Sequence, residues 1–277
     1  MKNKNALLII DAQYDFCNQD GTLFVQNADE DIKRLSVFIT KNAKEINHIC
    51  LTLDNHPIND ISHPSFWRDS NGNEPVPFTQ ITLNEVESGK WIPNFNPSQT
   101  REYLEKLESQ GQFPHIIWSA HCLTGSRGAA IDETLFKTLE FWVKENKKID
   151  QNKQYQTVIK GTYPLTEHFG IFQAQIPVEN RLETQLNVEL LESLNNYENL
   201  YLAGQAKSHC VATSLKQMMD YAPKLAKKVI ILEDCMSDIP NLGYLGEPIY
   251  QRAKKLGIQF VKSTEIDLHL KDKTIGI

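Results

Sequence analysis

Short apolar runs bounded by polar residues recur along the chain, and they constrain its fold more than any other feature of the sequence. Each has the length and the nearly continuous hydrophobicity of a strand that is buried on both faces of a parallel sheet. Between several runs the apolar residues follow helical spacing, as at Ile32, Leu35, Phe38 and Ile39 before the second run. The runs are residues 6–10, 49–53, 116–118, 157–159, 200–203, 229–232 and 258–261.

This alternation of strands and helices predicts an α/β protein, a three-layer doubly wound sandwich with a mostly parallel central sheet. The chain has 277 residues, of which 40% are hydrophobic, so it can bury one sizeable core. We therefore expect a single domain over residues 1–277.

An insertion at about residues 68–113 interrupts the alternation. Loops of that length are usually lids, contact surfaces or disordered segments. The apolar content of this segment is too high for typical disorder, so we expect it to be ordered and to bury its apolar side chains. Because its ends lie beside the expected site, it could wall that site as a lid or form a contact between subunits.

Composition excludes several partners. The formal net charge of -6 and the pI near 5.8 disfavour nucleic acid as a ligand, which requires a basic face. The five cysteines are scattered and form no CxxC pair, which is typical of reduced thiols. The run at residues 6–10 is too brief for a signal-peptide core or a membrane span. We expect a cytoplasmic protein with neither a nucleic-acid nor a membrane partner.

Polar residues stand at the ends of the expected strands, where doubly wound sheets place their functional residues. Cys210 lies between a strand and a helical pattern that starts at about Ser208, and a thiol at a helix N-terminus is acidified beside amides that can bind an oxyanion. Asp11 could exchange a proton with that thiol, and Lys160 could favour the thiolate. The alternatives are a buried structural cysteine, a capping or salt-bridging aspartate and a solvated lysine.

A second group, Asp54-Asn-His56 after the second run with His121 after the third, has the donor types of a divalent-metal site, for zinc or iron. His63 could be a further ligand or a solvated loop residue. Taken alone, a D-x-H pair is common, so this site stays a hypothesis at this point.

Four blocks, in this order, resemble the nicotinamidases within the isochorismatase-like cysteine hydrolases. They are Leu-Ile-Ile-Asp11-Ala-Gln-Tyr-Asp-Phe16, Thr52-Leu-Asp54-Asn-His56-Pro, Trp118-Ser-Ala-His121-Cys-Leu-Thr-Gly, and the pair formed by Ile159-Lys160-Gly161 and the segment 204–211. The resemblance implies an isochorismatase-like fold and hydrolysis of a small amide. It also implies a catalytic triad of Asp11, Lys160 and Cys210.

The same resemblance implies further roles. The amides of Ala206 and Cys210 would hold the oxyanion, beside a cis peptide at Gln205–Ala206. Phe16, Trp118 and Phe169 would enclose a pyridine ring. A divalent ion, zinc with iron or manganese as alternatives, would be bound by Asp54, His56 and His121, and would orient the ring nitrogen.

The sequence departs from the family pattern at three places. Ser208 stands where the family has an aspartate, the element around Phe169 is spaced differently, and the insertion is longer than in bacterial members. These departures leave open a related amidase for another small amide or ureido compound. A non-catalytic homologue that binds a pyridine or a partner protein is a further alternative. We expect a small-molecule amide as partner and leave homo-oligomerisation open.

Overall fold

The centre of the molecule is a six-stranded sheet in the order β5-β2-β1-β6-β7-β8, and every neighbouring pair is parallel. The computed structural model describes residues 4–271. Each of the predicted runs except that at 116–118 forms part of a sheet strand. The strands are β1 (Asn5–Ile10), β2 (Ile46–Asp54), β5 (Gln156–Lys160), β6 (Asn199–Gly204), β7 (Val229–Leu232) and β8 (Gln259–Val261).

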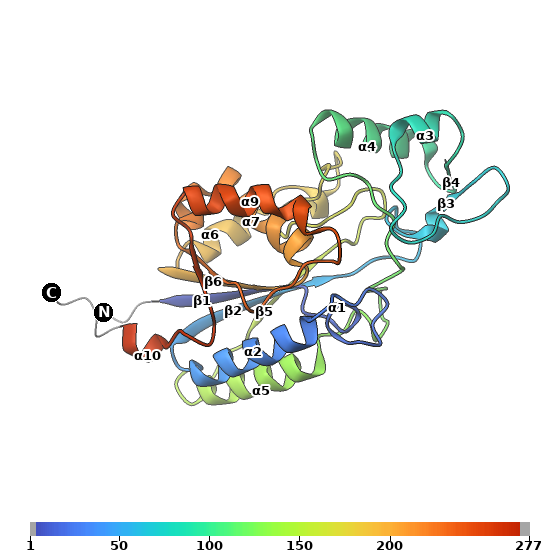
Figure 1. The fold of residues 1–277 in the computed structure, drawn as a ribbon. Helices are drawn as coiled ribbons and strands as arrows, with labels where there is room; N and C mark the ends of the chain where they lie inside the picture. The colour runs from blue at the N-terminus through green and yellow to red at the C-terminus, as the bar shows by residue number, and fades with distance from the viewer. Residues whose placement is uncertain (1–3, 272–277) are drawn as a thin grey trace.

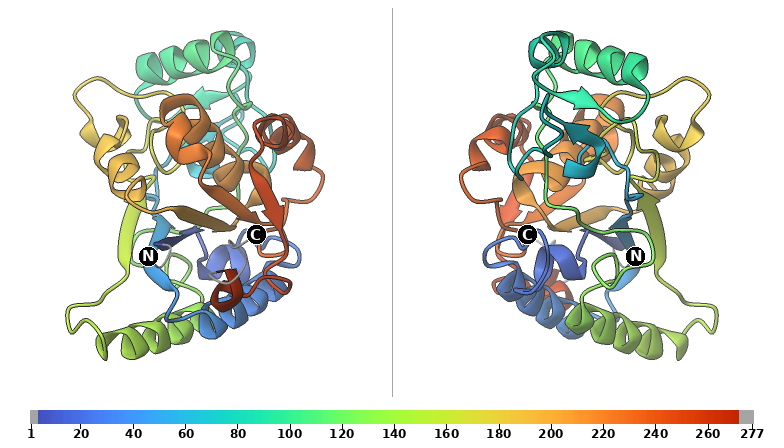
Figure 2. Two further views of the ribbon diagram at one scale, coloured as in Figure 1. Left: turned by 90° about the vertical axis from the view of Figure 1, so that its left-hand side faces the viewer. Right: turned by 90° about the vertical axis from the view of Figure 1, so that its right-hand side faces the viewer.

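Helices cover both faces of this sheet, which confirms the predicted three-layer α/β architecture (Figures 1 and 2). The helices α2 and α5 lie on one face, and α6, α7 and α9 lie on the other. No helix among residues 4–271 has both the length and the apolar character that crossing a membrane requires. The helices of these layers and their short neighbours are α1 (Tyr14–Cys17), α2 (Ala28–Lys41), α5 (Glu133–Lys147), η2 (Leu182–Thr184), α6 (Val188–Leu194), η3 (Lys207–Val211), α7 (Ala212–Tyr221), α8 (Pro223–Ala226), α9 (Gly243–Lys255) and α10 (Leu268–Lys271).

The helices form where sequence periodicity and capping coincide. In α2 the predicted apolar stripe is buried against the sheet, with Leu35 and Ile39 fully inaccessible. The helix α5 begins at a cap in which the carboxylate of Asp132 accepts hydrogen bonds from the N–H groups of Thr134 and Leu135. It buries Leu135, Leu139 and Trp142, and it packs against α2.

The apolar run at residues 116–118 was predicted as a strand, and that prediction is wrong. Its backbone bonds to loops instead of the sheet: Ile117 N–H donates to the carbonyl of Thr79, and Trp118 N–H donates to that of Ser62. The run is apolar because it passes between two cores. Trp118 belongs to the main core, while Ile117 belongs to a second one.

The insertion is folded, and its secondary-structure elements form a lobe at one end of the molecule (Figure 1). A second hydrophobic core joins it to the sheet domain, with Ile81 and Leu104 packing against Ile61 and Leu165. Burial of its apolar residues is incomplete, because Val76 and Phe95 remain exposed. The elements of the lobe and its base are η1 (Pro64–Phe66), β3 (Trp67–Arg68), α3 (Leu83–Glu87), β4 (Ile92–Pro93) and α4 (Pro97–Ser109).

The strand order reverses direction at the centre of the sheet. From β1 the chain proceeds outward through β2 to β5, then returns to β6 on the other side of β1 and continues to β8. At such a switch point the loops after the two central strands leave in opposite directions and open a crevice at the carboxyl ends. Residue 11 follows β1 and residues 205–210 follow β6, so the fold brings these two segments to one crevice.

Candidate active site

Three side chains of the site are placed by the ends of adjacent parallel strands. Asp54 and Lys160 are the last residues of β2 and β5 and lie directly opposite each other in the register. Asp11 follows β1, and its carboxylate accepts a hydrogen bond of 2.6 Å from the hydroxyl of Thr52 on β2. The chain turns at Gly161 with a φ of 77°, which glycine adopts without strain. A side chain would not fit here, because a Cβ would lie 2.6 Å from an oxygen of Asp54.

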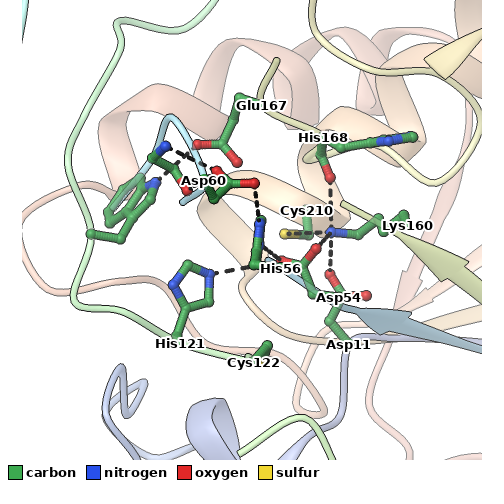
Figure 3. A network of polar contacts seen from close by, with 12 residues as sticks. Asp11, Asp54, His56, Asp60, His121, Cys122, Lys160, Glu167, His168 and Cys210 are labelled. Carbon is green, nitrogen blue, oxygen red and sulfur yellow. Dashed lines mark hydrogen bonds and ion pairs between the residues drawn. The ribbon is translucent and has the colours of Figure 1, made fainter. Parts of the chain in front are cut away.

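The ammonium of Lys160 is the centre of the polar cluster (Figure 3). Its Nζ lies 2.9 Å from Asp11 Oδ2, 2.9 Å from Asp54 Oδ1 and 3.8 Å from Cys210 Sγ, and it donates a 2.8 Å hydrogen bond to the carbonyl of His168. Lys160 is 2% exposed and Asp11 is fully buried. The structure therefore brings together the aspartate, lysine and cysteine that the sequence singled out.

Cys210 lies in the π-helical turn η3, which precedes α7. The turn starts after the peptide bond between Gln205 and Ala206, which is cis, as the family resemblance implied. The carbonyl of Ala206 accepts hydrogen bonds from the N–H groups of His209 and Val211. The helical backbone thus begins one residue before the expected Ser208, and it places Cys210 in the lining of a pocket.

The charges around Cys210 compete. Burial raises the pKa of the thiol well above its ordinary value, because the positive charge of Lys160 is offset by the carboxylates of Asp11 and Asp54. Burial therefore opposes the acidification of the thiol that the sequence predicted. Burial, with the nearby charge of Asp54, also raises the pKa of Asp11. A neutral thiol beside a carboxylate of raised pKa is suited to proton transfer during attack.

The predicted metal-binding residues also meet in one place. One donor atom from each of Asp54, His56 and His121 lies within 4.8 Å of the others. Asp54 Oδ2 is 3.1 Å from His56 Nε2 and 3.8 Å from His121 Nε2, so one carboxylate oxygen lies close to both imidazole nitrogens. Asp54 also contacts Lys160, so this group shares a carboxylate with the cluster around Cys210.

The outer nitrogens of both histidines have partners. His56 Nδ1 is 3.0 Å from Asp60 Oδ2, and the other oxygen of Asp60 accepts from the backbone and hydroxyl of Ser62. His121 Nδ1 is 2.9 Å from the carbonyl of Ser119. Hydrogen bonds of this kind place the ring hydrogen on Nδ1 and leave the Nε2 lone pair for a metal. The three donor atoms, and the hydrogen bonds that orient the two imidazole rings, therefore fit a divalent ion such as zinc.

His63 lies beside this group without joining it. Its Nε2 is 3.3 Å from His121 Nδ1, and it accepts a 3.4 Å hydrogen bond from the backbone N–H of His121. Burial and the neighbouring histidines lower its pKa to about 3. Of the two alternatives left by the sequence, a solvated loop residue is excluded, because His63 is fully buried.

A narrow pocket opens above Cys210, and all three predicted aromatic residues line it. Phe16 contacts the ring of His121 at 5.3 Å between centroids, and Phe169 contacts Trp118 at 6.3 Å. Ala206 also reaches the pocket. The complete lining is Phe16, Leu23, Asp54, Trp118, His121, Glu167, Phe169, Ala206, His209, Cys210 and Ile239.

Two acidic residues near the site, Glu167 in the pocket lining and Asp60 beside His56, were not identified from the sequence. Glu167 is 5% exposed and accepts a 3.3 Å hydrogen bond from the indole N–H of Trp118. Burial, with the nearby charge of Asp60, raises its pKa to about 8. The sequence offered one usable signal for Asp60, its spacing of four from His56. It offered none for Glu167, which lies in an irregular segment after β5.

At the level of sequence, the chain matches no family model and no curated protein. Solved structures share its fold. It is similar to the yeast nicotinamidase Pnc1p at a TM-score of 0.63 and 19% identity, over 93% of this chain and 99% of that one. It is similar to the pyrazinamidase of Pyrococcus horikoshii in complex with zinc at a TM-score of 0.54 and 19% identity, over 94% and 99%. For an isochorismatase family protein from Desulfovibrio vulgaris the TM-score is 0.53 and the identity 14%, over 97% and 99%.

The chain therefore has the isochorismatase-like fold. The solved structures that share it include nicotinamidases and pyrazinamidases, and this is the fold that the motif resemblance implied.

Proposed function

We propose that the protein is a cysteine amidohydrolase that converts nicotinamide to nicotinate and ammonia. The contact of one buried ammonium, Lys160, with Asp11, Asp54 and Cys210 carries this proposal. A cation among two carboxylates and a thiol is costly to bury. The site also has the donors of a metal-binding group at one side and aromatic walls above. This combination is suited to a small, planar aromatic amide.

In the proposed reaction, Asp11 takes the thiol proton as the sulfur of Cys210 attacks the carbonyl carbon of the amide. The amides of Ala206 and Cys210 stabilise the resulting oxyanion. The C–N bond then breaks, and ammonia leaves with the proton held by Asp11. Water, deprotonated by Asp11, attacks the thioester carbon and the C–S bond breaks, which releases the acid. The proton on Asp11 then returns to the sulfur of Cys210. Throughout the reaction, Lys160 stabilises the negatively charged forms of Asp11 and Cys210.

A divalent ion held by Asp54, His56 and His121 would supply open coordination positions that orient the substrate ring. The chain's own residues complete the pocket: Trp118 and Phe169 exclude water from the ring, and Phe16 packs against His121, one of the residues that would hold the ion. We infer zinc from the donor types, which also occur around iron and manganese.

The proposed function is tested by the release of ammonia from a panel of small amides by the purified protein. The panel contains nicotinamide, pyrazinamide, benzamide, a ureido compound and a linear aliphatic amide. We expect nicotinamide to be among the substrates with the highest kcat/KM. Turnover of the ureido compound alone would assign the site to a different amidase, and no turnover of any member would contradict a hydrolytic role.

Metal analysis of protein purified without a histidine tag is expected to give one divalent ion per chain. The double variant His56→Ala, His121→Ala should contain none, because it removes two of the three donors. Asp60→Asn should bind the ion about 10- to 100-fold more weakly, because His56 loses the carboxylate that orients it.

His63→Ala is the matched control for this measurement, since His63 lies in the same histidine cluster outside the donor group. We expect it to retain one ion per chain. Loss of the ion in His63→Ala with retention in the double variant would place the metal site elsewhere in the cluster.

The insertion is expected to influence substrate binding through Phe113. The Phe113 ring lies 6.1 Å from Phe169 and 5.6 Å from His209, centroid to centroid. Phe113→Ala should raise KM for aromatic amides by about 3- to 10-fold, the size of a lost aromatic contact, with a smaller effect on kcat. Phe95→Ala is the control, because Phe95 belongs to the same lobe and its ring contacts Phe66, away from the pocket. Equal effects of the two variants on KM would exclude an influence of Phe113 on the pocket through Phe169 and His209.

A further inference from the structure

The two residues before the nucleophile, Ser208 and His209, form a buried polar pair. Ser208 is fully buried and His209 is 2% exposed. Ser208 occupies the position at which the resembling family has an aspartate, so an acceptor with a fixed negative charge is replaced by a hydroxyl that can donate. The proposed reaction uses neither side chain.

The hydrogen bonds of Ser208 determine which nitrogen of His209 carries the ring hydrogen. The Ser208 hydroxyl oxygen accepts from the backbone N–H of Ile239 at 3.2 Å, and it lies 2.8 Å from His209 Nδ1. Among the described residues, Nδ1 is the hydroxyl hydrogen's one acceptor. Burial lowers the pKa of His209 to about 3, so the imidazole is neutral and carries one hydrogen. With Nδ1 accepting from Ser208, that hydrogen is on Nε2.

The Nε2 atom has no hydrogen-bond partner among residues 4–271, although it is buried. Three rings surround the imidazole: Trp118, Phe169 and Phe113, at centroid distances of 5.1, 5.3 and 5.6 Å. Aromatic rings are weak acceptors and replace a full hydrogen bond poorly. Buried donors usually have a partner, and an unpaired one is costly. His209 lines the same pocket as Cys210, so a bound molecule can provide the missing acceptor.

We propose that His209 is a specificity-determining residue: held by Ser208 as the Nε2–H tautomer, it donates a hydrogen bond to an acceptor on the bound aromatic amide. This inference rests on the proposed function. Because His209 and Cys210 both line this narrow pocket, the acceptor lies close to the carbon that Cys210 attacks. The substrate class favoured is therefore aromatic amides with a ring nitrogen next to the carbon that bears the carboxamide.

Two substrates isolate this effect. Nicotinamide and pyrazinamide share a ring nitrogen two positions from the carboxamide-bearing carbon, and pyrazinamide alone has a second nitrogen adjacent to that carbon. Any contribution of the metal-binding group to the shared nitrogen cancels in the ratio of their kcat/KM values. The ratio for pyrazinamide over nicotinamide therefore reports on the additional acceptor.

The experiment compares this ratio in the wild type, His209→Phe and His209→Gln. We expect the ratio to fall about 10-fold in His209→Phe, which is the effect of losing one hydrogen bond. Phenylalanine keeps an aromatic ring but has no donor. His209→Gln, which retains an N–H donor, should keep the ratio within about 3-fold. A purely structural role would change both substrates equally. An unchanged ratio in His209→Phe would overturn the inference.

The tautomer is tested separately by the nitrogen chemical shifts of labelled histidine, with the His209 signals assigned by their loss in His209→Phe. We expect Nε2 protonated and Nδ1 unprotonated in the wild type, and a mixture of tautomers in Ser208→Ala. A wild-type spectrum with the hydrogen on Nδ1 would overturn the role given to Ser208.

Binding of the product acids by calorimetry distinguishes failure of this inference from failure of the proposed function. If no amide is hydrolysed, but pyrazinoate binds more tightly than nicotinate and His209→Phe removes the difference, the site inference holds and the proposed function fails. If amides are hydrolysed, but His209→Phe changes neither the ratio of kcat/KM values nor the difference in affinity between the two acids, the inference about His209 fails and the proposed function stands. Absence of both hydrolysis and binding would overturn both.

Discussion

Replacement of Cys210 by alanine is expected to lower kcat for amide hydrolysis by about 10⁴-fold or more, with the fold intact. Loss of the nucleophile removes the covalent pathway, and enzymes that lose a nucleophile keep only the contribution of binding and of the oxyanion hole. The side chain is small and stands at the edge of the pocket, 6% exposed, so its removal leaves most packing unchanged. Ammonia release under saturating nicotinamide measures the effect.

Cys50→Ala is the matched control for this variant. Cys50 is a fully buried free cysteine in β2 and is not part of the pocket lining. It should retain wild-type kcat, and the denaturant midpoints of both variants show whether either change disturbs folding. Activity of Cys210→Ala within a factor of ten of wild type would contradict the proposed mechanism.

The sequence predicted the sheet because each strand is a local signal. A run such as residues 200–203 is apolar on both faces wherever it stands in the sheet, and the spacing of Leu35 and Ile39 marks a helix without knowledge of its partners. The run at residues 116–118 gave the same signal for another reason. Its alternate side chains enter two different cores, and only the folded insertion creates the second one.

Candidate residues of the site were found where motif and strand end coincide. Asp11, Asp54 and Lys160 each follow or end a strand, and the parallel register then brings them together. Glu167 had no such signal, and His209 lies inside the block at residues 204–211 but was not singled out as a site residue. Glu167 reaches the pocket from an irregular segment. The importance of His209 depends on its neighbour Ser208 and on its ring contacts with Trp118 and Phe113, which come from distant parts of the chain. Pairing across such distances is not encoded in local spacing.

The balance of charge at the site was also beyond local reasoning. A lysine near a thiol predicts a lowered thiol pKa, but burial and two carboxylates reverse the sign for Cys210. The net effect depends on how far each charge is removed from water, which only the folded arrangement determines.

Lys160→Met is expected to lower the free energy of unfolding by about 3–5 kcal/mol, the usual cost of removing one partner from a buried ion pair. Methionine is unbranched and retains most of the apolar stem of lysine, one atom shorter and without the ammonium, so the loss is mainly electrostatic. Asp11 and Asp54 would be left without their cation, and the carbonyl of His168 without its donor. Denaturant titration of the protein with and without added metal measures the change.

Two further variants test whether the cluster causes this loss. Lys137→Met removes an exposed ammonium that pairs with Glu133 within α5, and it should leave the denaturant midpoint unchanged. The double variant Lys160→Met, Asp11→Asn removes one of the unpaired carboxylates together with the cation. It should be more stable than Lys160→Met alone, because the two changes act within one network and are not additive.

The loss of unfolding free energy in Lys160→Met is expected to depend on pH, and the direction of that dependence follows from the pKa of Asp11. Burial already raises the pKa of Asp11, and Lys160 is the largest influence that lowers it. Without the ammonium the folded protein would hold a proton on Asp11 more tightly than the unfolded chain does. A group whose pKa is higher in the folded state favours folding as the pH falls. The deficit relative to wild type should therefore be larger at about pH 8 than at about pH 5. A deficit that grows on acidification would show that the ammonium does not stabilise these carboxylates.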